Sequence, residues 1–404
     1  MHQILKAFLT ALAITTVVTP AAIKIAPKIG AMDIPKDNRR MHKEPLPRFG
    51  GIAMFLGIFI SYLIYVPMDT QTMGLLVGMI LMFLLGLVDD FKNLRPKLKF
   101  AGQIVCAAVV WFYTIRINGM ANFFPFGPAY ISFPDWLSAC VTIFWIVGIV
   151  NAVNLVDGLD GLAAGITCIA CLSVAYTANY TGRPETTLMM LVIAGATIGF
   201  LLYNFNPAKI IMGDAGSLLL GFLLATVPLI GVTPTKSVTL FSVVVPVFIL
   251  ALPIFDTSYA IVRRAVNHRP IMQADKGHLH HRIMALGIGQ RRTVLALYSI
   301  SAIMGVAGIM WTVKFKFEAL ILAVIAGTLI VTFLGVGFKE TRSEEPSAET
   351  AETDPAGTDP KTTETESAET DPKTTETESA ETDPKTAETK SAGTDPETEE
   401  NKNA

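Results

Sequence analysis

The chain has 404 residues, of which 51% are hydrophobic and only 16% are charged. This low charge and a mean hydropathy of +0.48 exclude an ordinary soluble domain, in which about a quarter of the residues are charged. The formal net charge of -2 hides an asymmetry, because residues 339–404 hold 20 acidic and 7 basic side chains whereas residues 1–338 hold 14 acidic and 25 basic ones. We therefore expect a membrane domain over 1–338 and a separate acidic tail over 339–404.

Apolar segments long enough to cross about 30 Å of hydrocarbon follow one another along the first part of the chain. Their approximate limits are 3–22, 50–67, 72–89, 100–116, 136–154, 161–179, 187–203, 216–232, 239–261, 293–312 and 318–337. The first is a span and not a secretory signal, because one basic residue precedes it and many follow it, the reverse of the secretory order. The sequence thus predicts an all-α polytopic membrane protein with about eleven transmembrane helices.

Lysine and arginine are distributed unevenly between the loops of this membrane domain. With the N-terminus outside, the loops 23–49, 90–99, 155–160, 204–215 and 262–292 face the cytoplasm and hold 19 of them, and the outward side holds 6. Cytoplasmic loops of membrane proteins carry the excess of positive charge. The distribution therefore predicts an outside N-terminus and an inside C-terminal tail.

Carboxylates also collect on the predicted inward side. Asp89 and Asp90 close the third span, Asp214 precedes the eighth, and Asp256 lies in the ninth. Ionisable groups at membrane depth are candidates for function, because burying them without a use is costly.

The segment that ends the fifth span reads NAVNLVDGLDG, from Asn151 to Gly161. Its polar residues Asn151, Asn154, Asp157 and Asp160 recur at a spacing of three. On a helix this spacing forms one stripe, so we expect their oxygen atoms to face one cavity.

The sequence Gly213-Asp214-Ala215-Gly216-Ser217 opens the eighth span, where Asp214 or Ser217 is expected to act as the N-cap. Carboxylates that share one membrane face must be neutralised, separated or bound to a cation. Magnesium, with manganese as the alternative, suits such a cluster, because it uses one or two carboxylates and completes its shell with water and phosphate.

The last large inward loop contains the opposite charge, including the run His278-Leu279-His280-His281-Arg282. A zinc site is a poor match, because the run has no cysteine and an adjacent arginine. Positive-inside topology explains the arginines but not the histidines. Binding of a diphosphate explains both.

The tail consists of a twelve-residue repeat, with SAETDPKTTETE at 367–378 and SAETDPKTAETK at 379–390. It contains no Leu, Ile, Val, Phe, Tyr, Trp or Met after Phe338, so no apolar burial offsets its ordering entropy. We predict that it is disordered and solvating, with an acidic tether or calcium binding as the alternative.

Four motifs resemble those of the polyprenyl-phosphate N-acetylhexosamine-1-phosphate transferases and occur in the order of that family over residues 1–337. They are Asp89-Asp90, NAVNLVDGLDG, MGDAGS at 212–217 and GHLHHR at 277–282. The resemblance implies a multi-pass enzyme of the bacterial cytoplasmic membrane whose active site faces the cytoplasm. It would transfer a sugar 1-phosphate from a UDP-sugar to undecaprenyl phosphate, release UMP and require magnesium. No nucleic-acid partner is expected, and a homodimer is left open.

The resemblance also implies roles for single residues. Asp214 looks like the principal metal ligand, with Asp157 beside it, and Asp89 and Asp90 look like the catalytic pair near the lipid phosphate. Asp157 and Asp160 would share in catalysis. The substrate-binding residues would be Asn151, Asn154, His278, His280, His281 and Arg282.

Two branches of this family, and one other class of protein, fit the sequence. The first inward loop, with Arg40-Met-His42-Lys-Glu-Pro45-Leu-Pro47-Arg48-Phe-Gly50-Gly51, is similar to the branch that uses UDP-GlcNAc and starts teichoic acid, O-antigen or enterobacterial common-antigen (lipopolysaccharide-type) glycans. The phospho-MurNAc-pentapeptide translocases of peptidoglycan synthesis are the alternative branch. An ion-coupled transporter is the alternative class, although the charges gather at one face and the spans show no evident inverted repeat.

Overall fold

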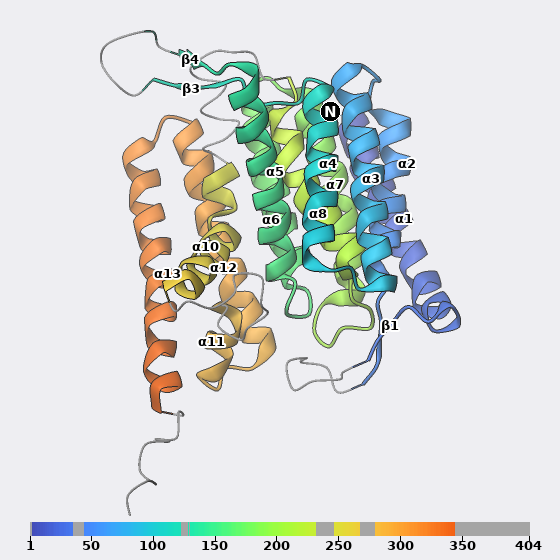
Figure 1. Ribbon diagram of the computed structural model, residues 1–404, viewed down its shortest axis with the longest axis vertical. Coiled ribbons are helices and arrows are strands. Elements are labelled where there is room, and N and C mark those ends of the chain that lie inside the picture. Colours follow the sequence, from blue (N-terminus) through green and yellow to red (C-terminus); the bar gives the residue numbers. More distant parts are fainter. Residues whose placement is uncertain are drawn as a thin grey trace, which may run out of the picture. The chain divides into compact units, whose positions relative to one another are not determined.

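The computed structural model describes residues 2–34, 44–122, 128, 130–231, 246–266 and 279–343, and these form a bundle of helices (Figure 1). The longer helices of the first half are α1 (His2–Ile25), α2 (Gly50–Tyr65), α3 (Thr70–Lys92), α4 (Pro96–Phe112), α5 (Asp135–Val156) and α6 (Leu162–Tyr180). They are followed by α7 (Pro184–Asn204), α8 (Gly213–Thr226), α10 (Ala251–Val266), α11 (Leu279–Ala285), α12 (Gln290–Thr312) and α13 (Lys316–Ser343). Short 3-10 turns, η1 (Ala26–Ile29) and η2 (Val227–Leu229), extend α1 and α8.

The structure confirms an all-α polytopic membrane protein. Within the described ranges, 7 helices are long and apolar enough to cross a membrane, namely α1, α3, α5, α6, α7, α12 and α13. The helices over the other predicted spans, α2, α4, α8 and α10, have 16, 17, 14 and 16 residues. Eleven crossings therefore stay a prediction. The start of the predicted span 239–261, and the tail from residue 344 onward, lie outside the described residues.

Local sequence signals account for several helix ends. Asp69 begins α3 with a capping box, because its carboxylate accepts the Thr72 N–H at 2.7 Å and the Thr72 hydroxyl accepts the Asp69 N–H. Asn93 is the C-cap of α3 and adopts the left-handed conformation, which Asn tolerates better than most residues. Helices α4 and α7 each begin with a proline, whose missing N–H costs nothing in the first turn.

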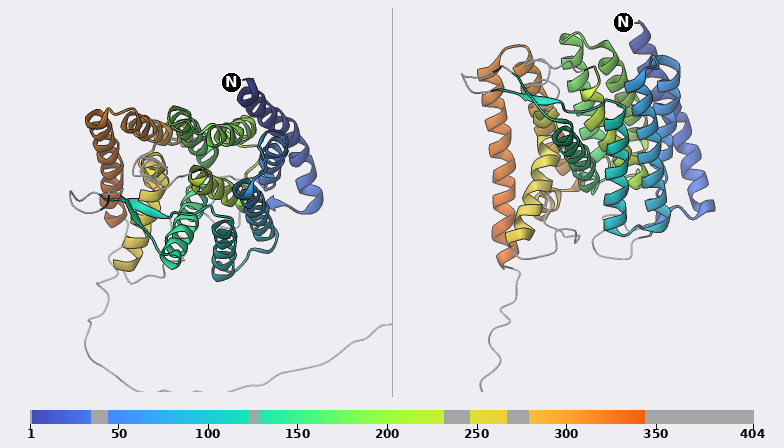
Figure 2. Two further views of the ribbon diagram at one scale, coloured as in Figure 1. Left: turned by 90° about the horizontal axis from the view of Figure 1, so that it is seen from above. Right: turned by 45° about the horizontal axis from the view of Figure 1, so that its top comes forward.

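Helix α8 is the central element of the bundle. Its residues 215–226 are all buried, and it packs against α2, α3 and α5 (Figure 2). Glycines allow this close approach: a Cβ at Gly86 of α3 would lie 2.5 Å from the Asp214 carbonyl oxygen, and a Cβ at Gly51 of α2 would collide with the Gly216 backbone nitrogen. The start of α8 is therefore held tightly between two neighbouring helices.

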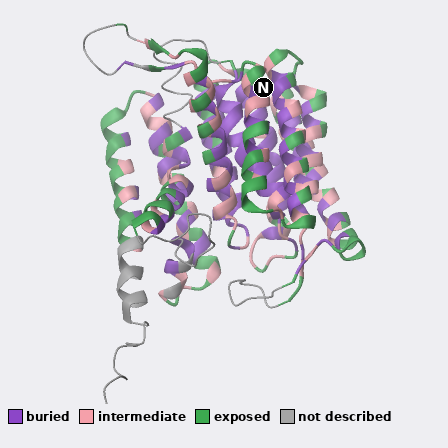
Figure 3. Cartoon of the chain, in the orientation of Figure 1, coloured by how far each residue is buried: buried purple, intermediate pink, exposed green. Residues whose placement is uncertain are grey.

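Burial differs strongly between helices, as Figure 3 shows. Most residues of α6 and α7 are buried, whereas α1 and α13 expose large apolar side chains such as Leu9, Val17, Leu320 and Val324. Exposed apolar side chains on long helices are expected where a helix faces lipid, because the hydrocarbon core is itself apolar.

Two small antiparallel sheets lie at opposite ends of the bundle (Figure 1). Strands β3 (Gly119–Ala121) and β4 (Tyr130–Ser132) form a hairpin at one end. Strands β1 (Met32–Asp33) and β2 (Leu46–Pro47) pair near the end where α3 and α5 finish and α8 begins.

Candidate active site

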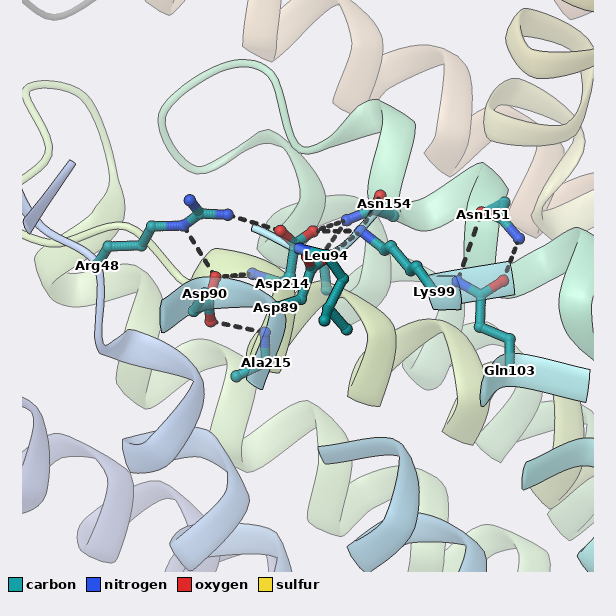
Figure 4. Close-up of polar contacts among 11 residues, drawn as sticks. Arg48, Asp89, Asp90, Leu94, Lys99, Gln103, Asn151, Asn154, Asp214 and Ala215 are labelled. Atoms are coloured by element: carbon teal, nitrogen blue, oxygen red, sulfur yellow. Dashed lines mark hydrogen bonds and ion pairs between the residues drawn. The ribbon is translucent and has the colours of Figure 1, made fainter. Parts of the chain in front are cut away.

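The C-terminal ends of α3 and α5 and the N-terminal ends of α4 and α8 meet at the end of the bundle opposite the β3–β4 hairpin (Figures 1 and 4). The polar and charged side chains that meet there are Arg48, Asp89, Asp90, Lys99, Asn154 and Asp214, which are joined by hydrogen bonds and ion pairs. The structure thus brings Asp89, Asp90 and Asp214 together.

Asp90 caps helix α8 from the neighbouring helix α3. Its Oδ1 accepts the backbone N–H of Asp214 at 2.7 Å and its Oδ2 accepts that of Ala215 at 2.9 Å. Arg48 Nε pairs with the same carboxylate at 2.9 Å. These contacts correct the expectation that Asp214 or Ser217 caps this helix: residue Met212 occupies the N-cap position without a side-chain bond, and the capping carboxylate comes from α3.

Asp214 is the carboxylate of the cluster that contacts both cations. Its Oδ2 accepts Arg48 Nη2 at 2.6 Å. Its Oδ1 accepts Lys99 Nζ at 2.8 Å and Asn154 Nδ2 at 2.6 Å. Two cations and one amide thus hold this side chain in a single orientation.

Asp89 lies on the other side of Lys99. Its Oδ2 accepts Lys99 Nζ at 2.9 Å, and its Oδ1 accepts the backbone N–H of Leu94 at 2.8 Å, just after α3 ends. The residue is buried. Lys99 therefore bridges Asp89 and Asp214, and both aspartates of the Asp89–Asp90 pair are paired with a cation.

The two asparagines of α5 make different contacts. Asn154 Nδ2 also donates to Ser217 Oγ of α8 at 2.7 Å. Asn151 Nδ2 instead donates to Gln103 Oε1 of α4 at 2.7 Å, and the buried Gln103 returns a longer bond of 3.5 Å. Asn154 is thus a member of the carboxylate cluster, whereas Asn151 joins α4 to α5 one turn away from it.

Helix α5 ends at Val156, so the predicted stripe does not continue as a helix to Asp160. The chain turns through Gly158 and then Gly161, whose φ of 78° is left-handed and favours glycine. As a result Asp160 Oδ2 accepts Asn206 Nδ2 at 2.8 Å and the Ala208 N–H at 3.1 Å. Asp160 therefore anchors the loop between α7 and α8, and among the described residues it makes no hydrogen bond or ion pair with the carboxylate cluster.

Asp157 follows the last residue of α5 and is the carboxylate of this group without a hydrogen bond or ion pair to any other described side chain. Burial raises the pKa of its carboxyl to about 7, and the nearby negative charges of Asp214 and Asp90 raise it in the same direction. Arg48 opposes this shift. Asp157 is therefore close enough to Asp214 for the two charges to interact.

The residues of the histidine and arginine run are described in part. His278 lies outside the described residues, and of His281 only the backbone, within α11, is described. His280 is buried against the turn after α5, because a Cβ at Gly158 would lie 2.5 Å from His280 Nε2. The Arg282 guanidinium lies over the Tyr259 ring at 5.2 Å. His280 thus borders the loop that contains Asp157.

Three contributors were missed at the sequence level as site residues. Lys99 had been counted only as a positive loop charge, Arg48 only as a loop charge and part of the branch motif at 40–51, and Gln103 had no assigned role. Arg48 lies between Pro47 and Gly50-Gly51, three residues whose carbonyl and N–H groups pair with the segment 211–212. This long-range pairing leaves no local signal in the sequence. Lys99 gives no local signal either, because two of its partners, Asn154 and Asp214, are 55 and 115 residues away in sequence.

The donor set suits a hard divalent cation. Among the described residues, no group of three His, Cys, Asp or Glu side chains is placed to hold a metal. Magnesium needs only one or two carboxylates together with water and phosphate oxygens. Asp157 has no ion pair, and it lies close enough to Asp214 for their charges to interact. These two carboxylates fit that requirement.

Comparison with known proteins gives consistent similarities. Residues 72–232 match the model of "Glycosyl transferase family 4". The chain is 41% identical over 312 residues, 76% of its length and 85% of the relative's, to "Probable undecaprenyl-phosphate N-acetylglucosaminyl 1-phosphate transferase" of Bacillus subtilis. It is 36% identical over 72% of its length to "Decaprenyl-phosphate N-acetylglucosaminephosphotransferase" of Mycobacterium tuberculosis, covering 78% of that protein. A "Phospho-N-acetylmuramoyl-pentapeptide-transferase" of Listeria monocytogenes is 29% identical over 57% of the chain and 76% of that protein.

Proposed function

The chain belongs to glycosyl transferase family 4 and is a phosphotransferase, and from this we propose that it transfers N-acetylglucosamine 1-phosphate from UDP-N-acetylglucosamine to undecaprenyl phosphate. The carboxylate cluster around Asp214, at one end of a membrane bundle, is the observation that carries this proposal. A transferase that joins a lipid phosphate to a sugar nucleotide needs its charged site near the membrane surface, where both substrates can reach it.

The proposed reaction forms one phosphate bond and breaks another. An oxygen of undecaprenyl phosphate attacks the β-phosphorus of the sugar nucleotide, and the bond from this phosphorus to the bridging oxygen of UMP breaks. The products are undecaprenyl-diphosphate-GlcNAc and UMP. The lipid phosphate is largely ionised near neutral pH, since the second pKa of a phosphate monoester is about 6. The protein therefore has to position and neutralise the reactants more than it has to remove a proton.

Magnesium, when bound, would offset the negative charge that phosphoryl transfer concentrates on the phosphate oxygens. Asp214 and Asp157 would hold it. Asn154 keeps Asp214 in position through the 2.6 Å bond to its Oδ1. We assign Lys99 and Asp89 to the lipid phosphate. The histidine and arginine run, His278, His280, His281 and Arg282, is assigned to the sugar diphosphate.

We further propose that the chain crosses a bacterial cytoplasmic membrane eleven times with its N-terminus outside, so that this cluster faces the cytoplasm. The uneven distribution of Lys and Arg supports this orientation. In a variant without native cysteines, a cysteine at the exposed Asn93 should react with an impermeant reagent only from the cytoplasm, and one at the exposed Met120 only from outside. Labelling of the first position from outside would overturn the orientation.

The donor is tested by direct assay. Purified protein, undecaprenyl phosphate and magnesium are mixed in turn with UDP-GlcNAc, UDP-GalNAc and UDP-MurNAc-pentapeptide, and UMP is measured. We expect UMP from UDP-GlcNAc, in keeping with the higher identity to the GlcNAc-named relatives. UMP from UDP-MurNAc-pentapeptide alone would move the chain to the translocase branch. No UMP from any donor, with correctly folded protein, would overturn the proposed reaction.

A further inference from the structure

Arg48 is fixed at the entrance to α8 by its own backbone. The chain from 47 to 51 pairs with the segment before α8: the Ile211 N–H donates to the Pro47 carbonyl at 2.9 Å, and the Gly50 N–H donates to the Ile211 carbonyl at 3.0 Å. The Arg48 N–H donates to the Ala31 carbonyl at 2.9 Å. This pairing places the guanidinium beside Asp90 and Asp214, which follow it in sequence by more than 40 and more than 160 residues.

The guanidinium uses only part of its hydrogen-bonding capacity. Nε contacts Asp90 and Nη2 contacts Asp214, whereas Nη1 has no partner among the described residues. Lys99 is different, because its ammonium has three donors and contacts Asp89, Asn154 and Asp214. Arg48, with its side chain 20% exposed, can therefore take a further acceptor, and Lys99 cannot without giving one up.

The two carboxylates that Arg48 contacts are not equivalent. Asp90 is only 6% exposed and is fixed by two backbone N–H groups, so its bond to Nε forms a firm anchor. Asp214 is 17% exposed and is the proposed metal ligand. A divalent cation on Asp214 would lie close to Nη2, and the two positive charges would repel each other.

The charge balance of the cluster is a second argument that Arg48 can serve the donor when metal is bound. Four carboxylates, of Asp89, Asp90, Asp157 and Asp214, accompany two cations, so the fully ionised cluster lacks two positive charges. One divalent cation supplies both, so the metal-bound cluster is balanced. A sugar nucleotide then brings a diphosphate whose negative charge requires positive partners, and the unused Nη1 of Arg48 is available to it.

We propose that Arg48 is an exchangeable counter-ion, which neutralises Asp214 in the free enzyme and moves its Nη groups to the diphosphate of the donor when metal and donor bind, with Nε still on Asp90. This inference rests on the proposed function, because that function supplies the diphosphate. It makes Arg48 a competitor of the metal and a ligand of the nucleotide. Loss of its charge should therefore change the two affinities in opposite directions.

The experiment compares Arg48→Gln, Arg48→Lys and the parent, with Lys209→Gln as the matched control, since Lys209 is an exposed cation at the same end of the bundle. Calorimetry measures Mg²⁺ binding to the purified full-length protein without substrates, and then UDP binding at saturating Mg²⁺. For Arg48→Gln we expect Mg²⁺ to bind about tenfold more tightly, and UDP about ten- to a hundredfold more weakly, as for loss of a charge-assisted hydrogen bond. Arg48→Lys should also bind Mg²⁺ more tightly and UDP more weakly than the parent, but by smaller factors. Lys209→Gln should match the parent in both affinities.

Two other results for the ligand affinities of Arg48→Gln would overturn the inference. Weaker binding of both ligands would mean that Arg48 only holds Asp90 and Asp214 in place. Unchanged UDP binding would mean that Nη1 meets no diphosphate. If Arg48→Gln does not fold, Arg48→Lys decides alone, because a structural role predicts no gain in Mg²⁺ affinity. These readouts need no turnover, so a failure of the proposed reaction is detected separately by the UMP assay on the parent.

Discussion

The carboxylate of Asp90, at the end of α3, accepts a 2.7 Å hydrogen bond from the backbone N–H of Asp214, at the start of α8. One aspartate of the cluster therefore determines the position of another through the backbone. Because the second bond of Asp90 goes to Ala215, both of its oxygens are occupied by the helix that it caps. This arrangement favours a positioning role for Asp90 and leaves Asp89 as the member of the pair beside Lys99.

The capping role predicts a loss of stability. Asp90→Asn retains a single acceptor oxygen, so one buried N–H of α8 loses its partner, which typically costs about 1–3 kcal/mol. We expect a lower unfolding midpoint by scanning fluorimetry in detergent, together with lower turnover. Asp135→Asn is the control, because its ion pair with Arg116 is exposed and contributes little. An unchanged midpoint with lost turnover would show instead that Asp90 acts on the substrates.

Asp214→Asn should abolish transfer while the protein stays folded. The change removes a charged ligand of the proposed metal and the partner of both Arg48 and Lys99. Loss of metal stabilisation of a phosphoryl transition state costs several kcal/mol, so turnover should fall by about two orders of magnitude or more. UMP release measures this, and excess magnesium should not restore it. Turnover within about tenfold of the parent would assign the metal to Asp157 instead.

The positions of the helices could be predicted from the sequence because each apolar run is bounded by polar residues, Gly or Pro. The fifth span was predicted to end at residue 154, close to Val156. The helical stripe was wrong, because the spacing of three in NAVNLVDGLDG was extended through Gly158 and Gly161, where the backbone turns. That turn sends Asp160 to Asn206. Periodicity describes a helix only as far as the helix continues.

The carboxylates of the site were predictable by residue type, and their cations were not. Arg48 reaches Asp214 because residues 47–51 pair with 211–212, a contact between segments that are far apart in sequence. Such pairing leaves no periodic signal in a single chain. In a loop rich in Lys and Arg, the sequence does not distinguish the basic residue that binds a carboxylate from the basic residues that set the topology.

Binding of magnesium should depend on pH through Asp157. Its carboxyl has a pKa of about 7, raised by burial and by neighbouring negative charge, so in the metal-free protein it is protonated below that pH and must lose this proton to bind the ion. The apparent Kd for Mg²⁺ should therefore rise by up to about tenfold per pH unit below 7 and level off above it. Calorimetry between pH 5.5 and 8.5 measures this dependence. Asp157→Asn should bind more weakly with a flatter profile, and an equally steep profile in that variant would assign the proton to another group.

Asp256 should control binding of the sugar nucleotide through the position of α11. It is buried on α10, and its Oδ1 accepts the Leu279 N–H at 2.8 Å, at the first residue of α11. The same helix holds Tyr259 under Arg282. Asp256→Ala should raise the KM for UDP-GlcNAc with little change in the KM for undecaprenyl phosphate, and Asp256→Asn, which keeps an acceptor oxygen, should recover most of the loss. Ser258→Ala, at an exposed position of α10, is the control.

A double-mutant cycle of Asp256 and Arg282 tests whether Asp256 acts by positioning Arg282 or independently of it. If Arg282 contacts the sugar diphosphate, Arg282→Ala should lower kcat/KM for UDP-GlcNAc by about ten- to a hundredfold, the loss expected for a charge-assisted hydrogen bond. If Asp256 acts only by holding the segment that carries Arg282, then Asp256→Ala should cost little more once Arg282 is absent, because coupled residues are not additive. Additive losses would mean that Asp256 contributes by another route. A parent-like response of Arg282→Ala to UDP-GlcNAc would assign its charge to topology, since the other basic residues of the loop preserve the positive-inside bias.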